Sequence, residues 1–253
     1  MKVIVLGSGS KGNSTLLMGS NKKLLIDVGF SYPKMKTLLN DHGVDFDDID
    51  GILITHTHKD HIAGLKAVVK NHRIKVFTNI VMYSELVKII DEEAIIINDD
   101  EYSIGEFDIS VIHTSHDAIG SVGFIINDSI NSMVYITDTG YINKCYMERL
   151  TNKNLYIMES NHDVEMLMKG PYPYILKQRV ISDKGHLSNE MAGNYLKDII
   201  GNNTKKIVLA HLSETNNEED VAVDTISSIV PIVEKNISLL VAKQDESIDI
   251  GEF

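Results

Sequence analysis

Three imidazoles and one carboxylate lie close together in the stretch Thr55–His61, whose sequence is THTHKDH. The apolar run Gly51–Ile54 precedes it and predicts a buried strand, so the cluster is expected where that strand ends and a helix begins. The side chains of His56 and His58, at alternate positions of an extended chain, point the same way, and Asp60 and His61 then start the helix. The four groups are His56, His58, Asp60 and His61. Unpaired imidazoles beside a carboxylate are costly without an ion. The stretch therefore predicts a metal centre, and its four groups suit two ions better than one.

Further candidate ligands follow other strand-like runs. His116 comes after residues 109–112, Asp138 after 133–136 and His211 after 207–210, while Asp27 ends the run 24–26. Taken singly, each suits a structural role, because an aspartate before a turn is commonly a turn former. Their joint occurrence in this order points to one site. His113 lies in the same run as His116 and competes with it.

The elements that would position these residues alternate along the chain. Strands are predicted at 2–6, 15–18, 24–28, 51–55, 75–78, 95–97, 108–112, 122–126, 132–137, 155–158, 206–210 and 237–241. Helices are predicted at 32–42, 62–70, 81–91, 144–150, 163–169, 189–200 and 218–233. Each half, the second from Glu101 onward, begins with hairpin-like strands and moves to strand–helix alternation. This order predicts an α/β fold of two sheets flanked by helices. The polar segment 244–253 is expected to be an edge strand or a loose tail.

Composition narrows the class of protein. A chain of 253 residues, 43% of them hydrophobic, can form one large domain or two small ones. No run approaches 18 apolar residues, so no membrane span is expected, and Met1–Gly7 is interpreted as a first strand rather than a signal peptide. The single cysteine, Cys145, fits a cytoplasmic protein. A net charge of −12 argues against nucleic-acid binding over a broad surface and leaves room for a local basic channel.

The order of the motifs resembles that of the metallo-β-lactamase superfamily over essentially the whole chain. The resemblance implies an αββα four-layer sandwich, formed by residues 1–253 as a single domain, with two bound divalent ions. It implies that one ion takes His56, His58 and His116, and that the other takes Asp60, His61 and His211. Asp138 would bridge them, and Asp27 would accept a hydrogen bond from a ligand histidine. His116 is preferred to His113 because His-Asp-Ala followed by glycine matches the family better. The nitrogen and oxygen donors suit Zn²⁺ or Mn²⁺, with Fe²⁺ as a further candidate.

Two other stretches are candidates for phosphate binding. Residues 7–14, GSGSKGNS, offer backbone N–H groups and the side chains of Ser10, Asn13 and Ser14 to an anion; the alternative is a flexible hairpin turn. Residues 182–189, SDKGHLSN, precede a predicted helix that Ser188 or Asn189 can cap, and a helix N-terminus is a natural seat for phosphate. Lys184 lies nearby, and His186 is expected to bind phosphate or act as a general acid. The alternative is a helix cap with an incidental histidine.

Within the superfamily, the second stretch resembles, in shifted form, the Ser-x-Gly-His motif of the ribonuclease J and cleavage-factor nucleases. Only about 47 residues separate Asp138 from Gly185, so the large inserted domain of those nucleases is missing. The stretches 159–163, 185–189 and 211–217 resemble the small single-domain YycJ/WalJ (VicX) group instead. That resemblance implies a 5′-to-3′ DNA exonuclease. Glu159 and His162 are expected to support the site from behind the ligands.

The predicted reaction is metal-assisted hydrolysis of phosphodiesters, with DNA favoured over RNA and with Asp60, Asp138 and His186 as the catalytic groups. The basic segment 169–179 carries Tyr172 and Tyr174, on which bases can stack; the alternative is an ordinary amphipathic helix. Two rival functions stay open. One is hydrolysis of a thioester, lactone or cyclic nucleotide on the same fold, and the other is a metal-bound regulatory protein. The sequence indicates no particular protein partner.

Overall fold

The computed structural model of the chain describes residues 1–233 and 235–253. Its backbone divides into two compact units, one formed by 1–111, 118–122 and 243–252, the other by 112–117, 123–242 and 253. The predicted organisation as a single domain stays a prediction. Among the described residues, no helix has the length and apolar character needed to cross a membrane.

The first unit contains most of the N-terminal elements. They are β1 (Lys2–Gly7), β2 (Ser14–Met18), β3 (Lys23–Ile26), α1 (Tyr32–Asn40), η1 (Phe46–Asp48), β4 (Gly51–Leu53), α2 (Lys59–Ile62), α3 (Leu65–His72), β5 (Val76–Thr78), α4 (Ile80–Leu86), η2 (Glu92–Ala94), β6 (Ile95–Ile97), β7 (Glu101–Ile104), β8 (Phe107–His113, up to Val111) and β14 (Ile248–Gly251). The second unit contains β9 (Val122–Asn127, from Gly123), β10 (Ser132–Ile136), η3 (Lys144–Tyr146), α5 (Met147–Leu150), β11 (Leu155–Glu159), α6 (Val164–Lys169), α7 (Tyr174–Val180), α8 (Asn189–Ile199), β12 (Lys206–Ala210), α9 (Glu219–Ile229) and β13 (Ser238–Val241).

The strands form two mixed sheets of seven, in the orders β14-β1-β2-β3-β4-β5-β6 and β13-β12-β11-β10-β9-β8-β7. In the first, β14, β1, β2 and β3 pair antiparallel, and β3 to β6 pair parallel, with Leu25 opposite Ile52. The parallel strands β3 and β4 are almost wholly buried, as their apolar runs predict. Because parallel strands end at one edge, the residues that follow β3 and β4 lie side by side.

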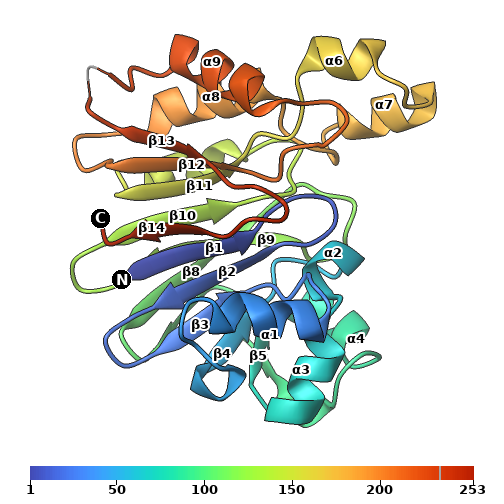
Figure 1. Cartoon of the computed structure of the whole chain (residues 1–253), viewed down its shortest axis with the longest axis vertical. Coiled ribbons are helices and arrows are strands. Elements are labelled where there is room, and N and C mark those ends of the chain that lie inside the picture. Colours follow the sequence, from blue (N-terminus) through green and yellow to red (C-terminus); the bar gives the residue numbers. More distant parts are fainter. Residues whose placement is uncertain (234) are drawn as a thin grey trace. The chain divides into compact units, whose positions relative to one another are not determined.

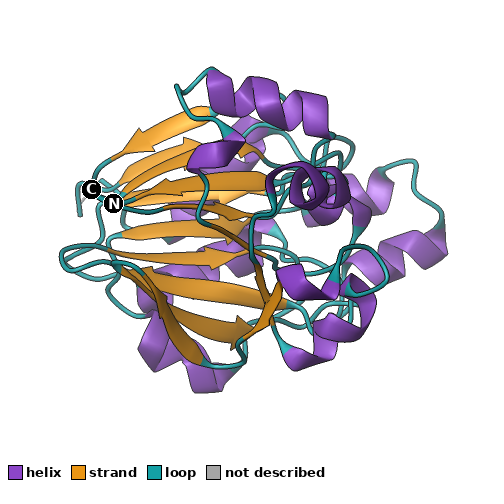
Figure 2. Cartoon of the chain, turned by 90° about the horizontal axis from the view of Figure 1, so that it is seen from below, coloured by secondary structure: helices purple, strands orange, loops and turns teal. Residues whose placement is uncertain are grey.

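The second sheet repeats this arrangement. β9 and β10 are antiparallel, and β10, β11, β12 and β13 are parallel (Figure 1). Helices α8 and α9 cover β11 to β13, and Leu196, Ile199 and Ile226 belong to the core cluster with strand residues such as Leu209. In Figure 2 the helices lie against the strands rather than among them. The carboxyl ends of β10, β11 and β12 therefore meet at one edge of the sheet.

The predicted strands are all present, with ends displaced by at most two residues, and the C-terminal segment forms an edge strand, β14, beside β1. The helix predicted over 62–70 corresponds to α3 and begins three residues later, because Ala63 and Gly64 separate it from the short helix α2. A Cβ at Gly64 would lie 2.4 Å from the carbonyl oxygen of Phe30, and the Gly64 N–H donates to Val28, so close backbone packing breaks the helix there.

Two other differences have local causes. The helix predicted over 218–233 ends at Ile229, because Pro231 disfavours helical backbone in the residue before it. Strand β7 was not predicted, since its sequence EYSI is largely polar and exposed. The segment 174–180 forms helix α7, which is the helical alternative of the sequence analysis.

Candidate metal centre

The first cluster of ligand-type side chains follows β4. The backbone leaves the strand at Leu53, and helix α2 begins at Lys59 with His58 as its N-cap residue. The ring of His56 lies edge-on to that of His58 with centroids 4.8 Å apart, and 4.0 Å from the ring of His61. Protonated imidazoles at such distances repel one another, whereas neutral imidazoles are ligands for a divalent ion. Asp60 adds a carboxylate oxygen 3.5 Å from His61 Nε2.

Asp27 fixes the orientation of His61. Its Oδ2 accepts a hydrogen bond from His61 Nδ1 at 2.7 Å and another from Thr55 Oγ1 at 2.7 Å, while Oδ1 accepts from the Thr55 N–H at 2.8 Å. Burial raises the pKa of this carboxyl above its ordinary value, although His61 and Thr55 act in the other direction. Because Nδ1 carries the proton, Nε2 is the lone-pair nitrogen of His61, the form in which a histidine binds metal.

The loop between His56 and His58 is held from α4. Thr57 Oγ1 donates a hydrogen bond to the carboxylate of Glu85. Glu85 was not predicted from the sequence, because it lies 28 residues from Thr57 in the chain. Only the position of α4 in the fold brings the two together.

The second cluster gathers at the carboxyl edge of β10, β11 and β12. Asp138, Glu159, His186 and His211 each offer one ligand atom within 4.8 Å of the others. At its centre, the buried Glu159 Oε1 accepts from His186 Nδ1 at 2.7 Å and from His211 Nδ1 at 2.9 Å. Its Oε2 accepts from the N–H groups of Thr139 and Leu187 at 3.1 and 3.0 Å.

These contacts set the charges of the second cluster. Burial by itself raises the pKa of Glu159, but His186 and His211 outweigh it and bring the pKa down to about 2. Burial lowers the pKa of His186, but the neighbouring Glu159 and Asp138 outweigh burial and bring the pKa above its ordinary value. Glu159 is therefore an anion, and it holds both histidines with their Nδ1 protons inward.

Asp138 lies among three histidines. Its Oδ1 is 3.3 Å from His211 Nδ1, 3.8 Å from His186 Nδ1 and 3.9 Å from His116 Nε2. His116 donates its Nδ1 proton to the Gly185 carbonyl at 3.2 Å, and burial lowers its pKa, so the ring is neutral with Nε2 as its lone-pair nitrogen. His113, three residues earlier, is exposed at the end of β8. The structure thus favours His116 over His113.

Three of the candidate residues have left-handed backbone. The φ angles are +61° at Asp27, +56° at Asp138 and +55° at His211, each just after a strand. This conformation costs a non-glycine residue on the order of 1–3 kcal/mol and is concentrated at functional sites. Neighbouring groups hold it in place: Asn161 Nδ2 donates to the His211 carbonyl at 2.9 Å, and the Ser213 N–H donates to the Asn161 carbonyl at 2.8 Å.

Four of the six predicted phosphate-binding residues are buried and bonded within the chain. Asn13 donates to the Gly9 carbonyl and, at 3.1 Å, to His61 Nε2, and Ser14 donates to the Asp27 carbonyl. Ser188 caps α8 by accepting from the Met191 N–H, as predicted, and Asn189 accepts from Ser160 Oγ. Ser10 and Lys184 are exposed. The part of all six in substrate binding stays a prediction.

His162, predicted to support the site, is buried beside α8. Its carbonyl accepts from the Asn189 N–H, and its Nδ1 has no hydrogen-bond partner among residues 1–233 and 235–253. Burial lowers the pKa of its imidazole to about 4, so the ring is neutral. Among the described residues, the His162 ring makes no hydrogen bond through Nδ1 to the second cluster, so its support of the site stays a prediction.

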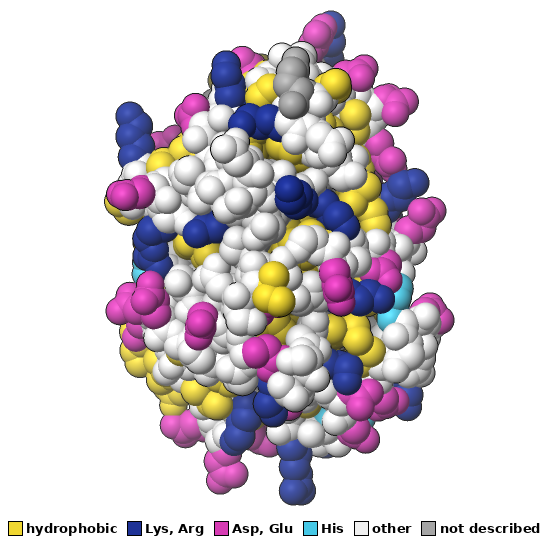
Figure 3. Space-filling model, turned by 90° about the vertical axis from the view of Figure 1, so that its left-hand side faces the viewer, with side chains coloured by type: hydrophobic (Ala, Val, Ile, Leu, Met, Phe, Trp, Pro, Cys, Tyr) yellow, Lys and Arg dark blue, Asp and Glu magenta, His cyan; other side chains and the backbone are white. Residues whose placement is uncertain are grey.

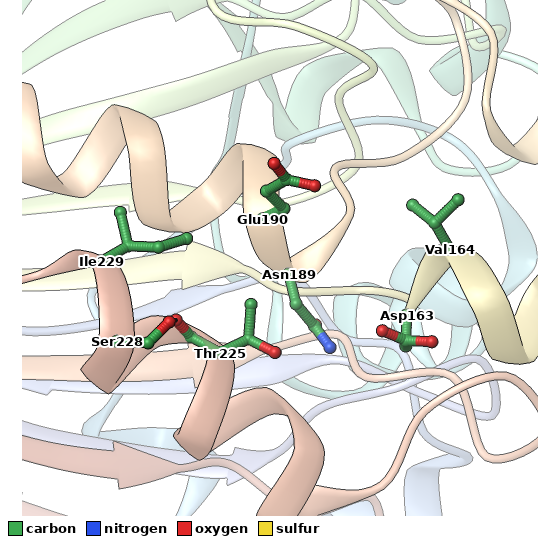
Figure 4. Close-up of a pocket in the computed structure, with 7 residues that line it drawn as sticks. All are labelled: Asp163, Val164, Asn189, Glu190, Thr225, Ser228 and Ile229. Atoms are coloured by element: carbon green, nitrogen blue, oxygen red, sulfur yellow. Dashed lines mark hydrogen bonds between the residues drawn. The ribbon is translucent and has the colours of Figure 1, made fainter.

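A hollow of about 300 Å³ opens near the start of α8, between α6, α8 and α9. Figure 4 shows the residues that line it: Asp163, Val164, Asn189, Glu190, Thr225, Ser228 and Ile229. A phosphate there would face the carboxylates of Asp163 and Glu190, which repel an anion. This hollow therefore does not suit the predicted phosphate seat.

The donor sets fit divalent metal ions. They combine imidazole nitrogens and carboxylate oxygens, and Asp27, Glu159 and the Gly185 carbonyl set the tautomers of three histidines, as is usual for metal-binding histidines. Such donors suit Zn²⁺, Mn²⁺ or Fe²⁺.

Comparison with known proteins identifies the family. A family model described as a beta-lactamase superfamily domain matches residues 22–212. The chain belongs to the metallo-β-lactamase superfamily. It is 35% identical to the exodeoxyribonuclease YycJ of Bacillus anthracis, over 89% of this chain and 88% of that one. It is 38% identical to the exodeoxyribonuclease WalJ of Streptococcus pneumoniae, over 87% and 85% of the two chains.

Among solved structures, the metallo-β-lactamase fold protein YhfI of Bacillus subtilis matches with a TM-score of 0.75 at 19% identity, covering 98% of each chain. This match confirms the predicted fold class, the αββα sandwich of the superfamily. The protein is a YycJ-type member of the family and a metal-dependent hydrolase.

Proposed function

We propose that the protein is a DNA exonuclease that hydrolyses phosphodiester bonds with the help of two divalent ions. The observation that carries the proposal is the second cluster, in which Asp138, His186 and His211 surround the buried anion Glu159. The relatives that are 35–38% identical to this chain are named exodeoxyribonucleases, which supports DNA as the substrate. The family resemblance implies that DNA is digested in the 5′-to-3′ direction.

The proposed ligands are those of the sequence analysis. His56, His58 and His116 would hold one ion, Asp60, His61 and His211 would hold the other, and Asp138 would be the ligand shared by both. When bound, the ions supply a water of lowered pKa as the nucleophile and a positive charge for the phosphate oxygens. The ions are Zn²⁺ or Mn²⁺, with Fe²⁺ as the further candidate.

His186 is the proposed general acid. Glu159 Oε1 accepts a hydrogen bond from the His186 Nδ1–H at 2.7 Å, which stabilises the imidazolium and leaves the Nε2–H to be donated. In this role, Nε2 gives its proton to the oxygen that leaves when the P–O bond breaks. Glu159 is not consumed, because it stays an anion that orients the ring.

The proposed contact with DNA covers only a small part of the protein surface. Cationic and acidic side chains are interspersed on the face shown in Figure 3, in keeping with the net charge of −12. In the basic segment, Lys169 pairs with Glu165, and Arg179 pairs with Asp117. These pairs reduce the charge that the segment presents to a phosphate backbone, whereas Tyr174 is 69% exposed and remains a proposed stacking surface.

The test is hydrolysis of single- and double-stranded DNA and of RNA, labelled at the 5′ or the 3′ end, with Mn²⁺ or Zn²⁺. We expect mononucleotides to be released from the 5′ end of DNA. Thioester, lactone and cyclic-nucleotide substrates in the same panel check the rival hydrolases. Asp60→Ala and Asp138→Ala should abolish turnover, whereas Asp198→Ala, on the exposed side of α8, should not change it. Undiminished nuclease activity in Asp138→Ala would refute the proposal.

A further inference from the structure

A second hollow, of about 170 Å³, lies in the second unit beside the loops that follow β8 and β10. The residues that line it are His113, Thr114, Ser115, Tyr141, Asn143 and Tyr146. The hollow lies outside the proposed metal centre, since His113 is not a proposed ligand and neither tyrosine belongs to a cluster.

The two loops are bonded to each other. The Ser115 N–H donates to Thr139 Oγ1 at 3.1 Å, and the Gly140 N–H donates to the Ser115 carbonyl at 2.9 Å. Thr139 Oγ1 in turn donates to the Tyr141 carbonyl at 2.7 Å. The wall of the hollow is therefore held by hydrogen bonds within the chain and does not depend on one exposed loop.

The same loops carry two proposed metal ligands. His116 follows Ser115 directly, and Asp138 precedes Thr139 directly. Among the lining residues, Ser115 is adjacent to His116, and Tyr141 lies three residues after Asp138. Consecutive Cα atoms lie about 3.8 Å apart, so the hollow is close along the chain to both proposed ligands.

The chemistry of the lining suits a flat, uncharged, polar ring. Tyr141, which is 38% exposed, and Tyr146 supply aromatic surface, on which any of the four nucleobases can stack. Thr114, Ser115 and Asn143 supply hydroxyl and amide groups that match the edges of a base. No lysine, arginine, aspartate or glutamate is among the described residues that line the hollow, so it does not suit a phosphate or an ammonium group.

The size of the hollow agrees with this chemistry. An apolar cavity of roughly 150 Å³ holds a benzene ring, so about 170 Å³ is enough for the six-membered ring of one base. A longer aromatic system or a second stacked base would extend into solvent.

We propose that this hollow binds one nucleobase of the nucleic-acid substrate and so positions the phosphate attached to it beside Asp138 and His116. The inference rests on the proposed nuclease function and adds a substrate contact to it. Tyr141 stacks on the base, and the polar lining groups bind its edge. Because stacking does not distinguish the four bases strongly, the contact suits an exonuclease that removes nucleotides of any sequence.

The experiment compares two 5′-labelled DNA oligonucleotides, one complete and one with an abasic tetrahydrofuran residue at the nucleotide to be released. The chains are the wild type, Tyr141→Ala, Tyr141→Phe and, as a matched control on α4 outside the hollow, Tyr83→Ala. For the wild type we expect a KM about 5- to 100-fold lower for the complete oligonucleotide, in line with one aromatic–base stack. Tyr141→Ala should lose this difference, while Tyr141→Phe and Tyr83→Ala should keep it.

The outcomes separate this inference from the proposed function. If the wild type cleaves both oligonucleotides with equal KM, the hollow does not bind a base, although the nuclease function stands. If Tyr141→Ala keeps the wild-type difference, the inference is likewise overturned. Absence of cleavage of every nucleic acid would overturn the proposed function itself. The comparison in the wild type needs no variant, so a Tyr141→Ala chain that fails to fold does not prevent a decision.

Discussion

The buried Glu159 and the partly buried His186 form a charged pair, with Oε1 accepting from Nδ1 at 2.7 Å. The same carboxylate also accepts from His211 and from two backbone N–H groups, so its four hydrogen bonds join the ends of β10, β11 and β12. Removing one partner of a buried charged network typically costs about 3–5 kcal/mol.

Glu159→Gln is therefore expected to lower the free energy of unfolding by about 3 kcal/mol. The amide NH₂ of glutamine would face the N–H groups of Thr139 and Leu187, or else a histidine Nδ1 proton, and all of these are donors. Urea unfolding measures the loss. Glu165→Gln is the control, since its pair with Lys169 is exposed and screened by water, so its loss should lower the free energy of unfolding far less. Equal effects of the two changes would contradict the role given to Glu159.

Asp27→Asn is expected to weaken metal binding by about 10- to 100-fold, because the hydrogen bond that orients His61 loses its charge. Affinity is measured by competition for Zn²⁺ with a chromophoric chelator. Asp108→Asn provides the control, since Asp108 accepts from Ser103 Oγ at 2.6 Å on the surface and belongs to no group of ligand-type side chains among the described residues. If the Asp27→Asn variant binds Zn²⁺ as tightly as the Asp108→Asn variant, Asp27 does not orient a ligand.

The buried His162 predicts a dependence of stability on pH. Its pKa is about 4 in the folded protein and 6.5 in the unfolded chain, so the unfolded chain takes up the proton first as the pH falls. This group therefore contributes its full stability above pH 6.5 and loses it progressively down to pH 4, by up to roughly 3 kcal/mol. His162→Gln lacks this proton uptake.

Urea unfolding of the wild type and of His162→Gln between pH 7.5 and 4.5 checks this prediction. The difference in unfolding free energy between the two chains should shrink as the pH falls, because only the wild type loses the contribution of His162. A difference that stays constant across this range would mean that the imidazole is not held neutral.

Removal of metal should lower both activity and stability. An ion that binds only the folded chain stabilises it by about 2.7 kcal/mol when its concentration is 100 times the dissociation constant. We expect Zn²⁺ or Mn²⁺ to raise the melting temperature of chelator-treated protein, and His58→Ala to reduce that rise. His42→Ala, which removes a histidine bonded to Ser247 and placed in neither cluster, should leave it unchanged. A rise of equal size in both variants would place the ion elsewhere.

Much of the fold is readable from local sequence. The strands that carry the site, such as β4 and β12, are short apolar runs, and burial on both faces of a parallel sheet requires runs of that kind. The helix cap at Ser188 follows from its side-chain oxygen. The interruption of the helical backbone at Gly64 cannot be predicted from local sequence, since it depends on the backbone of Phe30, more than 30 residues away in the chain.

The sequence by itself determined the types of the candidate ligand groups and their place after strands, because residue type and hydrophobic pattern are local properties. Only the tertiary structure distinguishes the buried His116 from the exposed His113, since burial depends on what packs against each residue. It alone made Glu159 the shared acceptor of His186 and His211, because that role requires parallel strands distant in sequence to end at one edge. The pairing of Thr57 with Glu85 and the hollow beside Tyr141 have the same origin. They arise from packing between segments, which no single segment encodes.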